Sequence, residues 1–221
     1  MKLLSSAAML AMASIVSPEG VLAEQTVSFR FGGMEFETHI PDGYCLPRGR
    51  DIDVAQLRAA ADDQNVTHLT LYRCQEAGVR RDYILIKTPN AALPLRLPRQ
   101  SFLAGVGEAF DSGPLRSDLA SGEMVRQVED RVSSVIGREV DLTGSIRPLG
   151  RDDVCAYLGG TMQVSSSTLT YSVSLGTCIT VVSNRVITIN WYGPDNGSAG
   201  IADLLRHSRR LAEQIQARRA P

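Results

Sequence analysis

The chain of 221 residues carries 23 basic and 24 acidic side chains, giving a formal net charge of −1. This length suits one domain with a sizeable core, and a near-neutral charge supplies no field that would attract nucleic acid or an anionic membrane. Beyond the N-terminus no run of about twenty apolar residues could span a bilayer. We therefore expect no nucleic-acid partner and no membrane-spanning segment.

The first 23 residues have the pattern of a secretory signal peptide. A positive start at Met1-Lys2 is followed by the uncharged apolar run Leu3–Val16, and Val21-Leu22-Ala23 places small residues at the −3 and −1 positions of a cleavage site. We predict cleavage after Ala23, which leaves residues 24–221 as a single mature domain. The expected location is the periplasm or the medium.

Four cysteines are present in this exported chain: Cys45, Cys74, Cys155 and Cys178. An oxidising compartment favours disulfides over free thiols, and four cysteines allow three pairings. No C-x-x-C spacing occurs and no histidines cluster near the cysteines, which argues against a redox motif and against structural zinc. We expect two structural disulfides.

The N-terminal half predicts a hairpin, a short helix and two further strands. Apolar residues alternate across Thr26–Ile40 on both sides of Gly32-Gly33, the pattern of a β-hairpin. A helix is predicted from Asp51 or Asp53 to about Asp62, with Val54, Leu57 and Ala61 on its buried face. The strands follow at Thr67–Cys74 and Tyr83–Thr88.

The middle of the chain predicts two helices between proline-rich and strand segments. Prolines from Pro89 to Pro98 favour an extended connection. Helices are predicted at Arg99–Phe110 and, beginning at Asp118 or Ser121, up to Ile136. Val140–Arg147 reads as a strand.

The C-terminal part predicts an antiparallel meander and a closing helix. Three β-rich runs, Val154–Val164, Leu169–Val182 and Val186–Tyr192, are separated by short polar breaks. Leu169–Leu175 alternates apolar with polar residues, as in a strand with one face nearer water. The helix should run from Ser198 or Gly200 to about Arg218, with a buried stripe between Ile201 and Ile215.

Counting along the first hairpin of the meander selects one disulfide pairing. A four-residue loop at Ser165–Thr168 would set Val164 opposite Leu169, and nine steps outward Cys155 would face Cys178 at a non-hydrogen-bonded site. Cys45 and Cys74 would then form the second pair. A two-residue loop would keep the pairing at the wider site, whereas a bulge at Gly159-Gly160 would shift the register.

The element order predicts an α+β fold: an antiparallel sheet, made of the N-terminal hairpin and the C-terminal meander, with helices packed on it and the C-terminal helix docked on the sheet. Phe36-Glu37-Thr38-His39-Ile40-Pro41-Asp42-Gly43-Tyr44 resembles the opening strand and turn of the PsbP-like family, and Ile201–Ile215 resembles its closing helix. The resemblance implies an α/β/α sandwich. It also implies a non-enzymatic role, because most members of this family lack catalysis.

The candidate polar site consists of His39, Asp42 and His68, which could meet across a sheet and act as acid and base or hold a metal ion. Lone strand histidines are usually half-exposed surface residues, so we predict no catalytic residues, no bound metal and no cofactor. No nucleophile motif occurs. Lys2 and Lys87 are the only lysines, which is typical of a GC-rich bacterial genome.

Three classes of function remain. The first is a non-catalytic binding or assembly protein of the bacterial cell envelope, with an envelope protein as its partner. The alternatives are a carrier of a small or lipidic ligand and an enzyme of unrecognised chemistry.

Overall fold

The computed structural model describes residues 25–75, 78–112, 129–131, 133–134 and 139–218. The predicted signal peptide lies outside the described residues, as does most of the helix predicted to end at Ile136. The strands are β1 (Thr26–Phe31), β2 (Met34–His39), β3 (Tyr44–Cys45), β4 (Asn65–Arg73), β5 (Tyr83–Pro89), β6 (Val140–Arg151), β7 (Ala156–Ser166), β8 (Thr170–Val182), β9 (Arg185–Pro194) and β10 (Gln216–Arg218). The helices are α1 (Arg50–Ala60), the short 3-10 helix η1 (Asn90–Ala92), α2 (Arg99–Asp111) and α5 (Gly197–Gln214).

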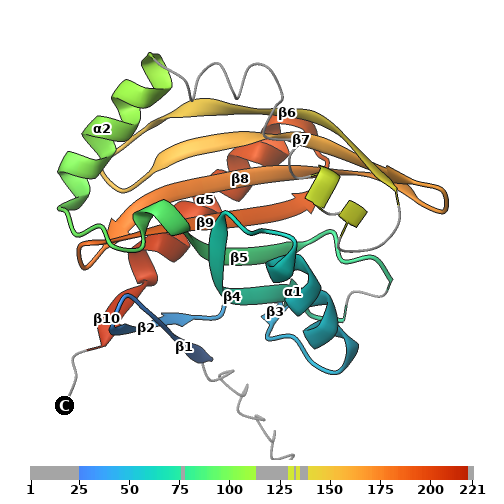
Figure 1. The fold of residues 1–221 in the computed structure, drawn as a ribbon, viewed down its shortest axis with the longest axis horizontal. Coiled ribbons are helices and arrows are strands. Elements are labelled where there is room, and N and C mark those ends of the chain that lie inside the picture. Colours follow the sequence, from blue (N-terminus) through green and yellow to red (C-terminus); the bar gives the residue numbers. More distant parts are fainter. Residues whose placement is uncertain (1–24, 76–77, 113–128, 132, 135–138, 219–221) are drawn as a thin grey trace, which may run out of the picture.

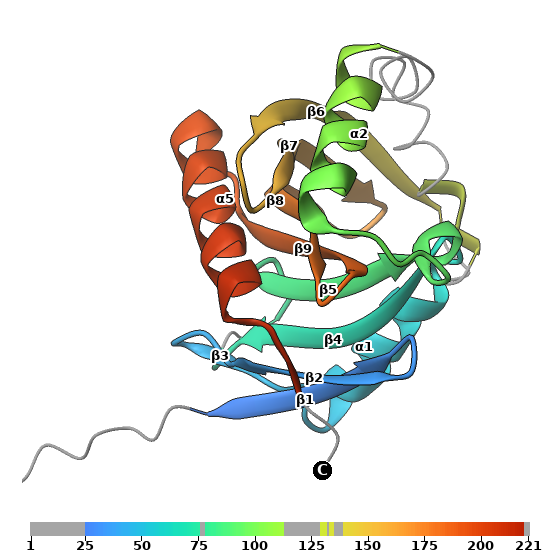
Figure 2. The same ribbon diagram turned by 90° about the vertical axis from the view of Figure 1, so that its left-hand side faces the viewer.

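Seven strands form one antiparallel sheet in the order β3-β4-β5-β9-β8-β7-β6, and a smaller sheet has the order β1-β2-β10. Figure 1 shows the large sheet as a long twisted layer, with the small sheet next to its β4 edge. The helix α5 covers one face of the large sheet, and α2 lies on the other (Figure 2). The predicted α+β class, the hairpin, the meander and the docked C-terminal helix are confirmed.

The main core lies between the large sheet, the small sheet and α5. Ile189 and Trp191 of β9 pack in one cluster with Leu211 of α5 and with Phe29 and Phe36 of the hairpin. Phe29 and Phe36 come from the alternating positions of the predicted hairpin, and Leu211 comes from the predicted buried stripe of the closing helix. The opposite face of the large sheet packs Ala156 and Ile179 against α2 through Leu103 and Phe110.

Both faces of β8 are therefore covered from Val173 onward, which corrects the prediction of one face near water; Thr170, at the start of the strand, is exposed. Ser174, expected on the wetter face, is fully buried and donates a hydrogen bond to Asp195. Thr177 and Thr180 are buried as well and hydrogen-bond to Asn190 and to the carbonyl of Val154. Each hydroxyl donates to a nearby acceptor, so these polar side chains are hydrogen-bonded although they are buried.

Both disulfides are present with the pairing that the sequence predicts, but the register behind one of them was predicted wrongly. Val164 pairs with Tyr171, so the hairpin loop lies one residue later than expected. Cys178 consequently faces Tyr157, and Cys155 lies just before β7 begins. The bend there still brings the two cysteine Cα atoms to 5.2 Å, within the range for a disulfide.

The orientation of α1 was also predicted wrongly. Val54 and Leu57, expected to be buried, are 36% and 41% exposed, and the helix contains no buried residue. Its contact with the sheet is polar instead: the Arg58 guanidinium lies 3.9 Å from the centre of the Tyr83 ring and donates to the carbonyl of Arg80. A cation on an aromatic face replaces the expected apolar stripe. Asp51, proposed as the helix cap, binds Arg80.

The C-terminal helix ends earlier than predicted. It stops at Gln214, and the chain continues as β10, which pairs with β2. None of the helices in the described part of the chain is long and apolar enough to cross a membrane.

Candidate functional site

A pocket of about 450 Å³ opens between α5 and the turn that joins β2 to β3. Side chains from the turn, from the ends of β4 and β9 and from α5 line it. The lining residues are His39, Ile40, Pro41, Asp42, Tyr44, Arg73, Asp82, Trp191, Gly193, Pro194, Asn196, Gly200, Asp203, Leu204, His207, Arg210, Leu211 and Gln214. The volume falls within the range of small-ligand sites.

The floor of the pocket is a hydrogen-bonded set of three side chains. The Trp191 indole N–H donates to the Tyr44 hydroxyl over 2.8 Å, and that hydroxyl donates to the Asp82 carboxylate. Burial, together with the hydrogen bond to Asp82, raises the pKa of Tyr44 far above its usual value. Tyr44 is therefore protonated at neutral pH and holds the carboxylate in a fixed position.

A disulfide holds the strands that carry this floor. Tyr44 pairs with Arg73 across β3 and β4, and the next residue along each strand is a cysteine of the Cys45–Cys74 bond. The Arg73 guanidinium carbon lies 5.5 Å from the centre of the Tyr44 ring. Gly43 has a φ of +78°, and a Cβ there would come within 2.9 Å of the same guanidinium. Residue 43 must therefore be glycine for Arg73 to lie in this position.

The other wall of the pocket is α5. Asp203, His207, Arg210 and Gln214 are three or four residues apart and so lie on one side of the helix. The His207 ring lies 5.1 Å from the Trp191 ring. Asp203 is an ion-pair partner of Arg206 on the same helix.

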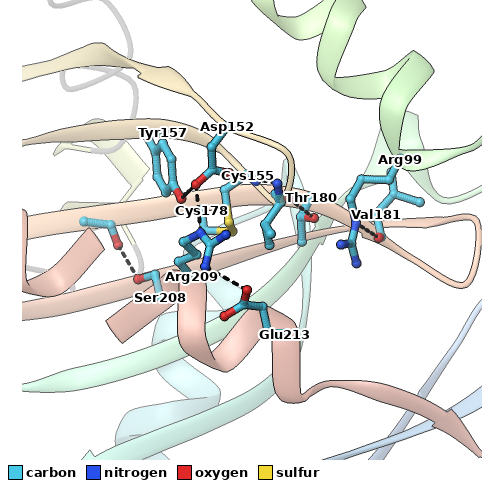
Figure 3. Close-up of a disulfide and its surroundings, with 12 residues drawn as sticks. Arg99, Asp152, Cys155, Tyr157, Cys178, Thr180, Val181, Ser208, Arg209 and Glu213 are labelled. Carbon is cyan, nitrogen blue, oxygen red and sulfur yellow. Dashed lines mark hydrogen bonds and ion pairs between the residues drawn. A yellow bond between two sulfur atoms is a disulfide. The ribbon is translucent and has the colours of Figure 1, made fainter. Parts of the chain in front are cut away.

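The opposite side of α5 is fastened to the sheet above the Cys155–Cys178 disulfide (Figure 3). The Asp152 carboxylate accepts hydrogen bonds from Arg209, from the Tyr157 hydroxyl and from the backbone N–H of Cys155. Although partial burial opposes ionisation, these donors lower the pKa of Asp152 to about 2. The Ser208 hydroxyl donates to the carbonyl of Gly176, where a side chain would clash with α5. The helix wall is thus fixed in place.

Of the predicted polar site, His39 and Asp42 line this pocket, but His68 does not. His68 lies between the two sheets, with its ring 4.4 Å from that of Phe31 and its Nε2 2.8 Å from the Thr88 hydroxyl. Burial lowers its pKa to about 4. His68 therefore does not join His39 and Asp42 in the pocket. Among the described residues, no group of three or more His, Cys, Asp and Glu could hold a metal ion.

Sequence reasoning missed Arg73, Asp82, Arg210 and the role of His207. In the sequence, His207 lies between Leu204 and Leu211 of the predicted buried stripe. That position was the signal that its side chain could line the pocket. Arg73 and Asp82 carry no such signal, because strand pairing alone brings them beside Tyr44.

The lining residues include no Ser, Thr, Cys or Lys. The usual hydroxyl, thiol and amine nucleophiles are absent from this part of the described chain, and the one phenol is held protonated. What the pocket offers is a set of fixed aromatic, cationic and anionic groups. That arrangement suits recognition of a ligand.

Fold and site together define an α+β domain with helices on both faces of an antiparallel sheet and a preformed polar pocket at one end. The chain is similar to the solution structure of cyanobacterial PsbP (CyanoP) from Synechocystis sp. PCC 6803, with 14% sequence identity and a TM-score of 0.39 over 93% of this chain and 100% of that chain. This agrees with the PsbP-like resemblance noted in the sequence, and at this TM-score it carries no inference about function. No protein-family model matches the chain. No curated protein matches it either.

Proposed function

We propose that the protein is exported and acts as a non-catalytic binding protein of the bacterial cell envelope, with the pocket beside α5 as its recognition site. The observation that carries the proposal is the fixed position of the pocket walls. Tyr44 is hydrogen-bonded to both Trp191 and Asp82. The Cys45–Cys74 disulfide links β3, which carries Tyr44, to the end of β4. A site that is ordered before its ligand arrives loses little entropy on binding.

Export is supported by the signal-peptide pattern of residues 1–23 and by the two disulfides, which persist in oxidising compartments. N-terminal sequencing of protein from a periplasmic fraction should begin at Glu24. Full-length protein in the cytosol would refute export.

The binding role is tested by capture from envelope extract with the tagged mature chain. His207→Trp fills the pocket from an exposed position on α5, and Ala202→Trp adds the same bulk to the same helix at an exposed position that does not line the pocket. We expect one reproducible partner with the wild type and with Ala202→Trp, and its loss with His207→Trp. Equal capture by both variants would show that the pocket is not the recognition site.

A small-molecule carrier is the second candidate, because the pocket volume suits a small ligand. Native mass spectrometry of protein purified from the periplasm distinguishes the two. A retained mass that disappears in His207→Trp favours the carrier.

A further inference from the structure

The charges around the pocket are unevenly satisfied. Of the three lining carboxylates, Asp82 accepts the Tyr44 hydroxyl and Asp203 is paired with Arg206. Asp42 is exposed at the rim. Two of the three carboxylates thus have a partner within the protein, Asp82 in the floor of the pocket and Asp203 in an exposed pair on α5.

The two guanidinium groups that line the pocket differ from these carboxylates in their pairing. Within the described part of the chain, neither Arg73 nor Arg210 forms an ion pair, and each lines the pocket from a different wall. Arginine is suited both to ion pairs within a protein and to recognition of carboxylate and phosphate groups on a ligand. No carboxylate among the described residues forms such an ion pair with Arg73 or Arg210.

Arg73 is also held in position without a salt bridge. The ring of Tyr44 supports the guanidinium on one side, and the missing side chain at Gly43 leaves room for it. Both supports are fixed by the β3–β4 pairing and the disulfide next to it. A planar guanidinium held in this way presents its donors in the geometry that matches a carboxylate or a phosphate.

The apolar lining residues indicate what kind of group would be attached to the anion of the ligand. Leu204 and Leu211 lie between the polar groups of α5, and Trp191 closes the floor beneath them. An apolar or aromatic group attached to the anion could cover this surface and keep water from it. Asp42 at the rim would disfavour a ligand of higher negative charge.

We propose that the pocket binds an anionic group, a carboxylate or a phosphate, joined to a small apolar body, with Arg73 and Arg210 as its charged contacts. This rests on the proposed binding function and specifies its ligand chemistry. The group can belong to a free small molecule or to an acidic side chain or terminus of the envelope partner.

Benzoate and phenyl phosphate are suitable probes, and ¹⁵N NMR titration of the mature, disulfide-bonded protein reports both affinity and place. We expect shifts in the Nε–H signals of Arg73 and Arg210. Arg73→Gln and Arg210→Gln should each weaken binding about tenfold, the loss typical of a hydrogen bond to a charged group. Asp42→Asn should tighten binding, because it removes a negative charge from the rim.

Arg48→Gln is the matched control, since Arg48 is exposed and lies outside the pocket. It should bind the probes as the wild type does. Unchanged affinity in the Arg73 and Arg210 variants, or a loss of equal size in Arg48→Gln, would overturn the proposal.

The affinity of the probes, and their competition with capture of the envelope partner, distinguish the two sources of the anion. Binding of a probe in the micromolar range indicates a free small ligand. Millimolar binding that still competes with capture of the envelope partner indicates an acidic group on that partner. If the probes do not bind while His207→Trp still abolishes capture, the anion proposal fails and the binding function stands.

Discussion

Protonation of His68 should cost the folded protein part of its stability. The Thr88 hydroxyl donates to the carbonyl of Val186, so its oxygen is left to accept a hydrogen bond from the Nε2–H of His68. The folded protein therefore holds the neutral imidazole with its proton on Nε2, stacked on Phe31. A second proton would have to enter on Nδ1 of a ring that is partly removed from water.

The magnitude follows from the two pKa values. Burial lowers the pKa of His68 from 6.5 to about 4 in the folded protein. Because the folded pKa is the lower one, the unfolded chain binds the proton first, and stability is lost as pH falls from about 6.5 towards 4. The full difference corresponds to roughly 3 kcal/mol, an upper limit for a ring that is only partly buried.

Urea unfolding followed by circular dichroism at pH 7, 6, 5 and 4.5 measures this effect. His68→Phe keeps an aromatic ring in the stack and removes the titrating group, so its stability should change less with pH than that of the wild type. Leu211→Ala lowers stability elsewhere in the core and keeps His68, so its pH dependence should run parallel to the wild type. If wild type and His68→Phe depend on pH equally, the placement of His68 is refuted.

Three further predictions test the docking of α5, the space at Gly32 and the contribution of Asp152 to stability. Leu211, 1% exposed, should cost about 2–5 kcal/mol when replaced by Ala, measured by thermal unfolding; a shift no larger than that of a surface variant would show that α5 is not docked. Gly32→Ala places a methyl group 2.6 Å from the Arg185 guanidinium, whereas Gly33→Ala meets nothing within 4 Å. Both glycines have positive φ, so the variants share backbone strain and Gly32→Ala should be the less stable by urea unfolding; equal losses would refute the clash. Asp152, whose pKa is lowered from 3.8 to about 2, stabilises the fold above pH 3.8 and loses that contribution as pH falls towards 2. Asp152→Asn should be less stable at pH 7 and show a flatter decline in acid; an unchanged acid profile would contradict this.

The sequence predicted those elements whose apolar residues repeat with a clear period. The hairpin around Gly32-Gly33, the meander and α5 all have such patterns, because each places a continuous set of apolar side chains in the core. The strand ends were less predictable. Gln216–Arg218 forms β10 although the segment is polar and largely exposed, since its backbone completes the small sheet beside β2.

Two errors arose where the contact is not apolar or the strand is irregular. For α1, periodicity predicted that Val54 and Leu57 face the sheet, but both are exposed. The residue of α1 that contacts the sheet is Arg58, whose guanidinium lies over the ring of Tyr83. In β4, the pairing shifts between Thr67 and Leu69, so His68 leaves the regular alternation and turns towards Phe31. A bulge of one residue has no sequence signature here, yet it decides which face a side chain occupies.

The pocket was the least predictable feature. His39 and Asp42 were recognised as polar candidates, but the other lining residues come from β4, β9 and α5, up to 175 residues further along the chain, the separation of Gln214 from His39. Pairing of distant strands creates this proximity, and no local pattern records it.

The pairing of β10 with β2 ties the last described strand of the chain to its first hairpin. Glu37 faces Gln216, and two residues on from Glu37 is His39, which lines the pocket. The small sheet can be completed only after synthesis has passed Arg218, because β10 is the last of its three strands along the chain. Contacts this far apart in sequence also form slowly. Assembly of this side of the pocket is therefore a late event in folding, and removal of β10 would affect binding before it affected the seven-stranded sheet.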